Sequence, residues 1–218
     1  MSYVFMKALE KRAEKYNKGI KILTLGRLPK IQKYIADNLV NRNEKLLDIG
    51  MGTGNFAILC AKNGIDVIGI DYSEKMLEIA RKTIESEGLT EFIKIFKMPI
   101  VELDEKFPDK TFDKITASLT FSEFYYDEQE FCLDQVYRIL KDDGEFILVD
   151  EVRPKKIWKK IVYFMIRIPL LIITYIISHL TTKSLKNIES RLKRHKFLVV
   201  EKKHFLLDTL LLLRLKKL

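Results

Sequence analysis

Residues 45–56 read KLLDIGMGTGNF, and this stretch decides the fold. The apolar residues that end in Asp48 predict a buried strand with a carboxylate at its tip. Three glycines at alternate positions, Gly50, Gly52 and Gly54, predict a tight turn, because glycine adopts positive φ and lets a ligand approach the backbone. The helix expected after the turn has unpaired N–H groups in its first turn. The stretch therefore predicts a strand, a ligand-binding loop and a helix.

Two classes of cofactor use such a loop. Dinucleotide-binding loops follow G-x-G-x-x-G, in which the third glycine would stand where this chain has Asn55. The spacing D-x-G-x-G-x-G instead resembles the first motif of class I S-adenosylmethionine (SAM) methyltransferases. In that family Gly50, Met51, Gly52 and Gly54 would lie under the methionine part of SAM, whose ammonium group suits Asp48. An ordinary strand-turn-helix is the alternative that three glycines leave open.

Length, composition and cysteine content limit the kind of protein this chain can be. The chain has 218 residues, of which 47% are hydrophobic and 32% charged, enough for a single domain over residues 1–218. Cys60 and Cys132 fall at apolar positions and form no C-x-x-C pattern, which favours buried thiols in a reducing compartment. The first residues carry no secretory signal pattern, so a cytoplasmic location is expected, with peripheral membrane association left open.

The net charge of +9 is unevenly distributed. Residues 153–218 hold 17 Lys and Arg against 3 Asp and Glu, whereas residues 1–152 hold 22 against 27. Such a basic segment fits an anionic surface, whether membrane headgroups, nucleic acid or an acidic protein, or else a solvated helix face.

Residues 1–42 show helical spacing of apolar side chains and predict an N-terminal helical cover. In methyltransferases of this class, extra N-terminal helices often lie over the cofactor. The resemblance therefore implies that Tyr16 borders the SAM pocket, with simple helix packing as the alternative.

Asp66–Asp71 reads as a second buried strand. A carboxylate at its tip, Asp71, has the position from which the family binds the ribose hydroxyls. The resemblance also places Tyr72 and Met76 against adenine, although Met76 fits the core equally well. Ser73 is suited to cap the next helix.

A third strand, residues 92–96, is followed in the family by an acidic residue that binds the adenine amino group. That residue is absent here, so backbone groups around Met98, or else Glu102, are the candidates. The run 107–115 follows the P-x-x-x-F-D pattern that precedes the fourth strand in many small-molecule methyltransferases, and it ends near Ser118, a further cofactor candidate.

The loop 118–126 lies at the carboxyl end of a central strand, where open α/β sheets bind ligands. Asp127 with Glu130 resembles a capping box that opens a helix. This helix is expected to stop at residues 142–144, and the fifth strand to begin at Glu145.

Four markers in the correct order over residues 45–151 make the resemblance to class I SAM methyltransferases specific. It implies an α/β fold: a Rossmann-like, seven-stranded, mostly parallel sheet whose last strand is antiparallel, with N-terminal helices and a helical insertion after the fifth strand. The expected final elements are a helix over residues 184–195 and strands over 197–203 and 206–216.

The insertion, residues 155–182, is apolar and interrupted by Arg167 and Pro169. A central Arg costs about 2.5–3.5 kcal/mol on membrane insertion, which disfavours a membrane span. The alternatives are two short helices broken at Pro169 that form a lid, or a surface that contacts a membrane or a protein partner.

A narrower resemblance rests on residues 3–6, 16–28, 121–123 and 153–157. These stretches are similar to the corrinoid-protein-associated methyltransferases of anaerobes and methanogens. The resemblance implies a corrinoid protein as partner, or else a small-molecule substrate.

Methyl transfer from SAM is an in-line displacement, so alignment supplies much of the catalysis, and a base is needed only when the acceptor sheds a proton. No catalytic residue is assigned; the weak candidates are Glu123, Tyr125, Tyr126 and His179. No metal site is expected, because the histidines lack ligand spacing. Nucleic-acid bases are disfavoured as acceptors, because residues 118–121 lack the Asn/Asp-Pro-Pro-aromatic motif.

Three functions therefore stand open. The first is a SAM-dependent methyltransferase that acts on a small molecule or a corrinoid-related acceptor. The second is a non-catalytic SAM-binding accessory protein of a corrinoid system. The third is a peripheral-membrane methyltransferase of lipids or quinones.

Overall fold

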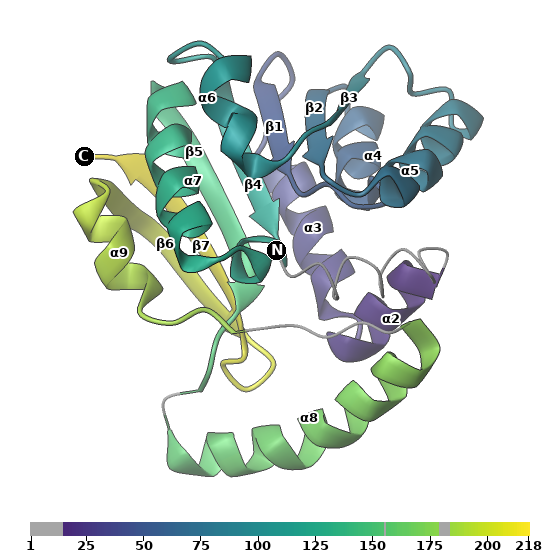
Figure 1. The fold of residues 1–218 in the computed structure, drawn as a ribbon, viewed down its shortest axis with the longest axis vertical. Coiled ribbons are helices and arrows are strands. Elements are labelled where there is room, and N and C mark those ends of the chain that lie inside the picture. The colour runs from purple at the N-terminus through teal and green to yellow at the C-terminus, as the bar shows by residue number, and fades with distance from the viewer. Residues whose placement is uncertain (1–14, 155, 179–183) are drawn as a thin grey trace.

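The computed structural model describes residues 15–154, 156–178 and 184–218, and a seven-stranded sheet forms its centre (Figure 1). The strand order is β3-β2-β1-β4-β5-β7-β6, in which β7 runs antiparallel to both of its neighbours and the other pairs are parallel. The strands are β1 (Lys45–Ile49), β2 (Asp66–Asp71), β3 (Ile93–Lys97), β4 (Phe112–Ser118), β5 (Leu140–Glu151), β6 (Phe197–Phe205) and β7 (Leu210–Lys217). The predicted Rossmann-like fold is confirmed.

Helices cover both faces of the sheet and enclose a hydrophobic cluster on each. On one face lie α2 (Tyr16–Leu23), α3 (Arg27–Asn38), α4 (Asn55–Lys62) and α5 (Glu74–Ser86). On the other lie α6 (Leu103–Lys106), α7 (Tyr126–Ile139) and α9 (Ile188–Arg194). The short 3-10 helices η2 (Ile100–Glu102) and η3 (Phe121–Glu123) follow β3 and β4.

The leucine run of β7 shows why the strands are continuously apolar. Leu210 and Leu212 pack in one cluster, whereas Leu211 and Leu213 pack in the other. Side chains alternate between the faces of a strand, so a strand covered on both faces needs an apolar residue at every position.

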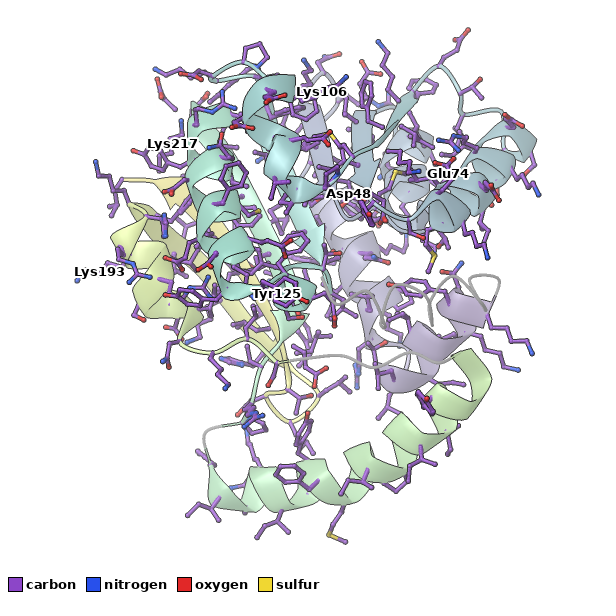
Figure 2. All side chains as sticks on the ribbon, in the orientation of Figure 1. Asp48, Glu74, Lys106, Tyr125, Lys193 and Lys217 are labelled. Atoms are coloured by element: carbon purple, nitrogen blue, oxygen red, sulfur yellow. The ribbon has the colours of Figure 1, made fainter. Side chains whose placement is uncertain are left out.

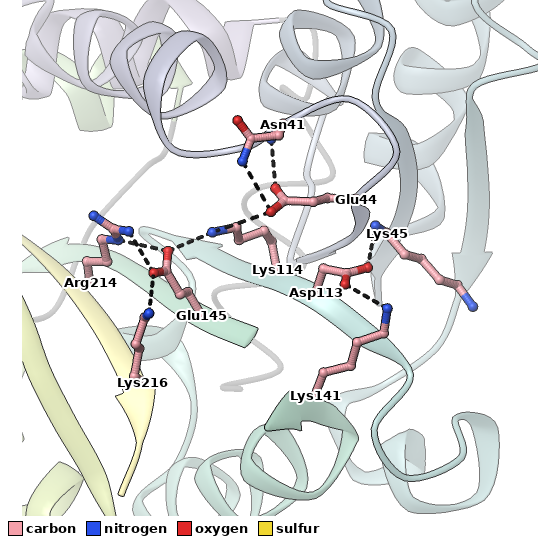
Figure 3. Close-up of polar contacts among 9 residues, drawn as sticks. All are labelled: Asn41, Glu44, Lys45, Asp113, Lys114, Lys141, Glu145, Arg214 and Lys216. Atoms are coloured by element: carbon pink, nitrogen blue, oxygen red, sulfur yellow. Dashed lines mark hydrogen bonds and ion pairs between the residues drawn. The ribbon is translucent and has the colours of Figure 1, made fainter. Parts of the chain in front are cut away.

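The amino ends of the parallel strands are tied by ion pairs around Glu145 (Figure 3). Lys114 Nζ of β4 donates to Glu145 Oε2 at 2.7 Å, and Arg214 of β7 donates to both carboxylate oxygens at 2.6 and 2.7 Å. Burial alone would raise the pKa of Glu145, but these two cations hold it at about 2. The contacts join β4, β5 and β7.

The insertion contains a single helix, α8 (Ile157–Ser178), which continues through Pro169. The prediction of two short helices is therefore wrong. Proline removes only its own N–H from the helical ladder, and a long helix can bend there instead of ending; Figure 1 shows α8 on a curved path with one end against α2. Within the described residues, no helix has both the length and the apolar character that crossing a bilayer requires.

Two local predictions around α7 are also wrong. The N–H of Tyr125 donates to the carboxylate of Glu128 at 2.7 Å, so the capping residues are these two and not Asp127 and Glu130. The helix ends at Ile139, and residues 141–144 belong to β5 because Leu140 already pairs with Phe112. Ser73 does precede α5, but its side chain makes no capping hydrogen bond.

Candidate active site at the carboxyl edge of the sheet

The glycine loop between β1 and α4 has the geometry that its sequence predicts. Gly50, Gly52 and Gly54 have φ values of 69°, 55° and 79°, where other residues are strained. A Cβ atom built on Gly50 would lie 2.2 Å from Cγ2 of Thr120, whose hydroxyl donates to the carbonyl of Gly50. Glycine at position 50 therefore lets the loop after β4 close against the glycine loop.

Asp71 joins the glycine loop to the tip of β2. Its Oδ2 accepts the N–H of Gly52 and its Oδ1 accepts the N–H of Ser73, both at 2.8 Å. Burial raises the pKa of Asp71, whereas these backbone donors act in the opposite direction. The loop and the carboxylate thus form one unit.

Asp48 is only 2% exposed and lies opposite Thr116 of β4. The Thr116 hydroxyl donates to Asp48 Oδ1 at 2.8 Å. Burial raises the pKa of Asp48 to about 7, the Thr116 hydrogen bond opposes the shift, and Asp71 adds to it. Figure 2 shows Asp48 in the interior, beside the sheet.

Tyr16 of α2 lies beside the glycine loop, with ring atom Cε1 3.8 Å from a Cβ built on Gly52. Burial raises the pKa of the Tyr16 hydroxyl, and the nearby Asp71, Glu123 and Asp150 raise it further. The same helix supplies Asn17, whose amide oxygen accepts from Thr53 at 2.7 Å. The helical cover thus closes over the loop through α2.

Two acidic residues at the end of β5, Asp150 and Glu151, belong to this edge. Asp150 accepts the N–H of Ser122 at 2.8 Å; burial raises its pKa to about 7, against the hydrogen bonds from Ser122. The Tyr163 hydroxyl of α8 donates to Glu151 Oε1 at 2.8 Å. The sequence prediction missed this pair, although adjacent acids at the end of an apolar strand are the same signal that marked Asp48 and Asp71.

Three aspartates at this edge, of which Asp48 and Asp150 are buried and Asp71 is partly buried, differ from the buried carboxylate of Glu145. Throughout the described parts of the chain, Asp48, Asp71 and Asp150 form no ion pair with Lys, Arg or His. A cavity of about 60 Å³ beneath the loop is lined by Asp48, the glycine loop, Tyr16 and Ser118. This edge therefore offers carboxylates without a cationic partner in the described chain to whatever binds there.

The other candidates from the sequence lie further out or in the core. Met51 and Met76 pack in the hydrophobic cluster under α4 and α5, and Met98 packs in the opposite cluster. Tyr72 is exposed at the end of β2. Met51 also lines the 60 Å³ cavity together with Asp48, whereas Tyr72, Met76 and Met98 do not line it.

Among the catalytic candidates, Glu123 is buried in η3, whereas Tyr125 and Tyr126 are more than half exposed at the start of α7 (Figure 2). His179 lies outside the described residues. The Tyr126 ring packs against the guanidinium of Arg191, whose Cζ is 4.9 Å from the ring centroid. Tyr126 therefore has a packing partner, whereas Glu123, like Asp71 and Asp150, lies close enough to Tyr16 to raise the pKa of its hydroxyl.

A second cavity, of about 900 Å³, lies between α7, α8, α9 and the end of β5. Its wall includes Ser122, Phe124, Glu151 and Tyr163. Ser122 is two residues from Thr120, which covers the glycine loop, so their Cα atoms are at most about 7 Å apart. Asp48, Asp71, Asp150 and Glu151 together form the acidic edge of the sheet. The cavity is thus adjacent to this acidic edge and large enough for an organic molecule.

The chain is similar to known methyltransferases. A family model described as a methyltransferase domain matches residues 47–148. A demethylmenaquinone methyltransferase of Thermotoga maritima is 31% identical over 169 residues, which cover 74% of this chain and 69% of that protein. A demethylmenaquinone methyltransferase of Bacteroides fragilis is 31% identical over 117 residues, 53% of this chain and 46% of that protein. The chain spans about half the length of most of the curated relatives it matches.

A solved structure with the same fold is a putative SAM-dependent methyltransferase from Methanococcus maripaludis. Its TM-score is 0.67 at 22% identity, over 96% of this chain and 94% of that one. The match extends through the helices and the antiparallel strands beyond the matched domain.

Proposed function

The chain belongs to the class I SAM-dependent methyltransferases, and on that premise we propose that it transfers a methyl group from SAM to a small acceptor with a largely apolar body. The acceptor binds in the cavity between α7, α8 and α9. The observation that carries the proposal is that Asp48, Asp71 and Asp150 lie at the carboxyl edge beside the glycine loop and, within the described residues, form no ion pair. Perturbed carboxylates of this kind gather at functional sites.

The residues of the acidic edge fit SAM. SAM has a positive sulfonium and a positive ammonium group, which buried carboxylates stabilise, whereas they would repel the pyrophosphate of a dinucleotide. Asp71 would hold the ribose hydroxyls with lone pairs left free by Gly52 and Ser73, and Asp48 would face the ammonium group. The backbone at Gly50 and Gly52, without a Cβ, would hold the methionine part.

SAM supplies an electrophilic methyl group when it is bound. The role of the protein is to align the acceptor with this methyl group and to exclude water. Such alignment can lower the activation barrier by about 7–11 kcal/mol. An acceptor hydroxyl or amine must also lose a proton. Glu151 is the proposed base, because it lies on the cavity wall, and Tyr163 orients its carboxylate through a 2.8 Å hydrogen bond.

A quinone-like or lipid-like acceptor is the finer part of the proposal. Two relatives are named for methylation of demethylmenaquinone. Support also comes from α8, whose exposed apolar side chains recur every three or four residues along one face. They are Ile157, Ile161, Phe164, Met165, Ile168, Ile172 and Tyr175.

This face of α8 is proposed to contact an anionic membrane. Phe164 and Ile168 belong both to the exposed face and to the wall of the cavity, so an apolar acceptor has a continuous path along them. Exposed Arg153 and Lys156 precede the helix and complement anionic headgroups. Flotation with phosphatidylglycerol vesicles tests the contact: the native chain should float and Ile161→Glu/Ile168→Glu should not. A native chain that stays with the soluble fraction contradicts it.

Turnover tests the acceptor. Labelled SAM is incubated with the protein and a reduced demethylnaphthoquinone, phosphatidylethanolamine vesicles or a corrinoid protein. Labelled quinol is the expected product, and Glu151→Gln should lower kcat about 100-fold as expected for a lost base. The corrinoid partner implied by the narrower resemblance predicts label on the corrinoid protein instead. SAM binding without label in any fraction indicates the accessory role.

A further inference from the structure

We infer that the acceptor carries an acidic group, a carboxylate or a phosphate, which binds to Arg191 at the α9 side of the 900 Å³ cavity. The inference rests on the proposed function and narrows its substrate class. It starts from a buried guanidinium whose hydrogen bonds are incomplete.

Arg191 is 6% exposed and lines the cavity. Its Nε donates to Glu130 Oε1 at 2.5 Å and its Nη1 donates to Gln129 Oε1 at 2.6 Å. Its Nη2 has no partner; in the described chain, the only other buried side-chain polar atom without one is Ser73 Oγ. A guanidinium has five N–H donors, and leaving one of its nitrogens desolvated and unpaired is costly unless a ligand completes the set.

The cavity around Arg191 has an excess of positive charge. Arg153, Lys186 and Arg194 line it as well. Glu130 pairs with both Arg191 and Arg194, and the ring of His195 contacts Glu130 and Asp134, whereas Arg153 and Lys186 form no ion pair with a described carboxylate. The carboxylate of Glu151 lies elsewhere on the wall, on β5, bonded to Tyr163. The α9 side therefore favours an anion.

The guanidinium is held in a fixed orientation. Its Cζ lies 4.9 Å from the ring centroid of Tyr126 and 5.8 Å from that of Phe121, as in cation–π contacts. A planar fork held in this way can bind a carboxylate or phosphate with directional hydrogen bonds. Phe124, Phe164 and Ile168 supply apolar wall for the rest of the acceptor.

The two ends of the cavity then orient the acceptor. Its acidic group binds at α9, and the atom to be methylated lies toward Ser122 and Glu151, next to the acidic edge that holds SAM. Opposite charges at the two ends disfavour the reversed orientation, because an anion beside the aspartates would be repelled.

Three aromatic probes of one shape test the inference: 2-naphthol, 6-hydroxy-2-naphthoate and 2-naphthyl phosphate. Each is titrated by fluorescence into the full chain saturated with SAM. At least one acidic probe should bind about tenfold or more tightly than 2-naphthol, as expected for a charged hydrogen bond. The tighter of the two acids identifies carboxylate or phosphate as the group.

Arg191→Gln should remove the preference for the acidic probe, and Arg81→Gln should keep it. Arg81 is a matched control because it also pairs with a carboxylate, Glu74, but lies outside the cavity. If circular dichroism shows that Arg191→Gln is unfolded, Arg194→Gln replaces it, since that side chain is 59% exposed. It should reduce the preference about threefold, a typical effect of a partly exposed charge.

Equal binding of acidic and neutral probes overturns the inference, as does a preference for the acidic probe that is unchanged in Arg191→Gln, or in Arg194→Gln where that variant replaces it. Calorimetry with SAM on the same samples separates this outcome from failure of the proposed function. Normal SAM binding beside equal probe binding contradicts only the acidic group. Absence of SAM binding in the native chain contradicts the methyltransferase proposal itself.

Discussion

The two edges of the central sheet bury carboxylates in opposite ways. At the carboxyl edge, Asp48 and Asp150 have no cationic partner among the residues that the structure describes, and burial raises their pKa values to about 7. At the amino edge, Lys114 and Arg214 surround Glu145 and hold its pKa at about 2 in spite of burial (Figure 3). The contrast distinguishes a carboxylate that is satisfied within the fold from one that requires a ligand.

Replacement of Asp71, the carboxylate proposed to bind the ribose hydroxyls, should give the largest effect on SAM affinity. Asp71→Ala takes away the acceptor of the Gly52 and Ser73 N–H groups as well as a ligand contact. We expect SAM affinity to fall about 100-fold or more in calorimetry, the effect of losing charged hydrogen bonds.

Asp113→Ala is the control at the amino edge, where Asp113 accepts from Lys45 and Lys141. It should lower stability and leave SAM affinity unchanged. Similar SAM affinities of native protein and Asp71→Ala would contradict the functional difference between the edges.

Glu145→Gln should lower the free energy of unfolding by about 2 kcal/mol in urea titrations. Breaking a buried pair commonly costs about 3–5 kcal/mol. The expected value is smaller because Lys114 stays within 3.8 Å of Glu44, and Arg214 within 3.9 Å of Glu201. Unchanged stability would show that the amino edge is not held by this carboxylate.

Asp48→Asn should change the free energy of unfolding in the opposite direction to Glu145→Gln. Replacing an unpaired buried carboxylate by an amide should raise the free energy of unfolding by about 1 kcal/mol at pH 8, a common gain at functional positions. SAM affinity should fall about tenfold, because the ammonium group loses its counter-charge. Destabilisation by this substitution would place Asp48 with the structural carboxylates.

The pH dependence of stability should also differ between the edges. The pKa of Asp48 is higher in the folded protein than in the unfolded chain, so its contribution to stability falls as pH rises from about 4 to about 7. The pKa of Glu145 is lower when folded, so its contribution is present above about pH 4.5 and is lost toward pH 2.

Urea titrations from pH 3 to pH 8 measure both slopes. The advantage of Asp48→Asn over the native chain should grow up to about pH 7 and then level off. The disadvantage of Glu145→Gln should shrink below about pH 4.5. If the stability of both variants depended on pH in the same way, the proposed electrostatic difference between the two edges of the sheet would be contradicted.

Local sequence was enough for the part of the site that depends on neighbouring residues. Alternate glycines predict positive φ values at positions 50, 52 and 54, and an acid at a strand end predicts where Asp71 lies. Local sequence was insufficient for α8, because whether a helix bends or ends at Pro169 depends on what packs against both halves. The same holds for Glu130, which fits a capping box in sequence but pairs with Arg191 and Arg194.

The sequence by itself therefore determined the strand, loop and helix around residues 45–56, and its resemblance to class I methyltransferases predicted the fold class and the family. The strand, loop and helix depend on backbone conformation and on apolar periodicity, which are local properties. Only the tertiary structure decided that Asp150 joins Asp48 and Asp71 without a cation, and that Arg191, 40 residues further along the chain than Glu151, lines the same cavity. Charge compensation depends on distances between residues far apart in sequence, and those distances exist only in the folded chain.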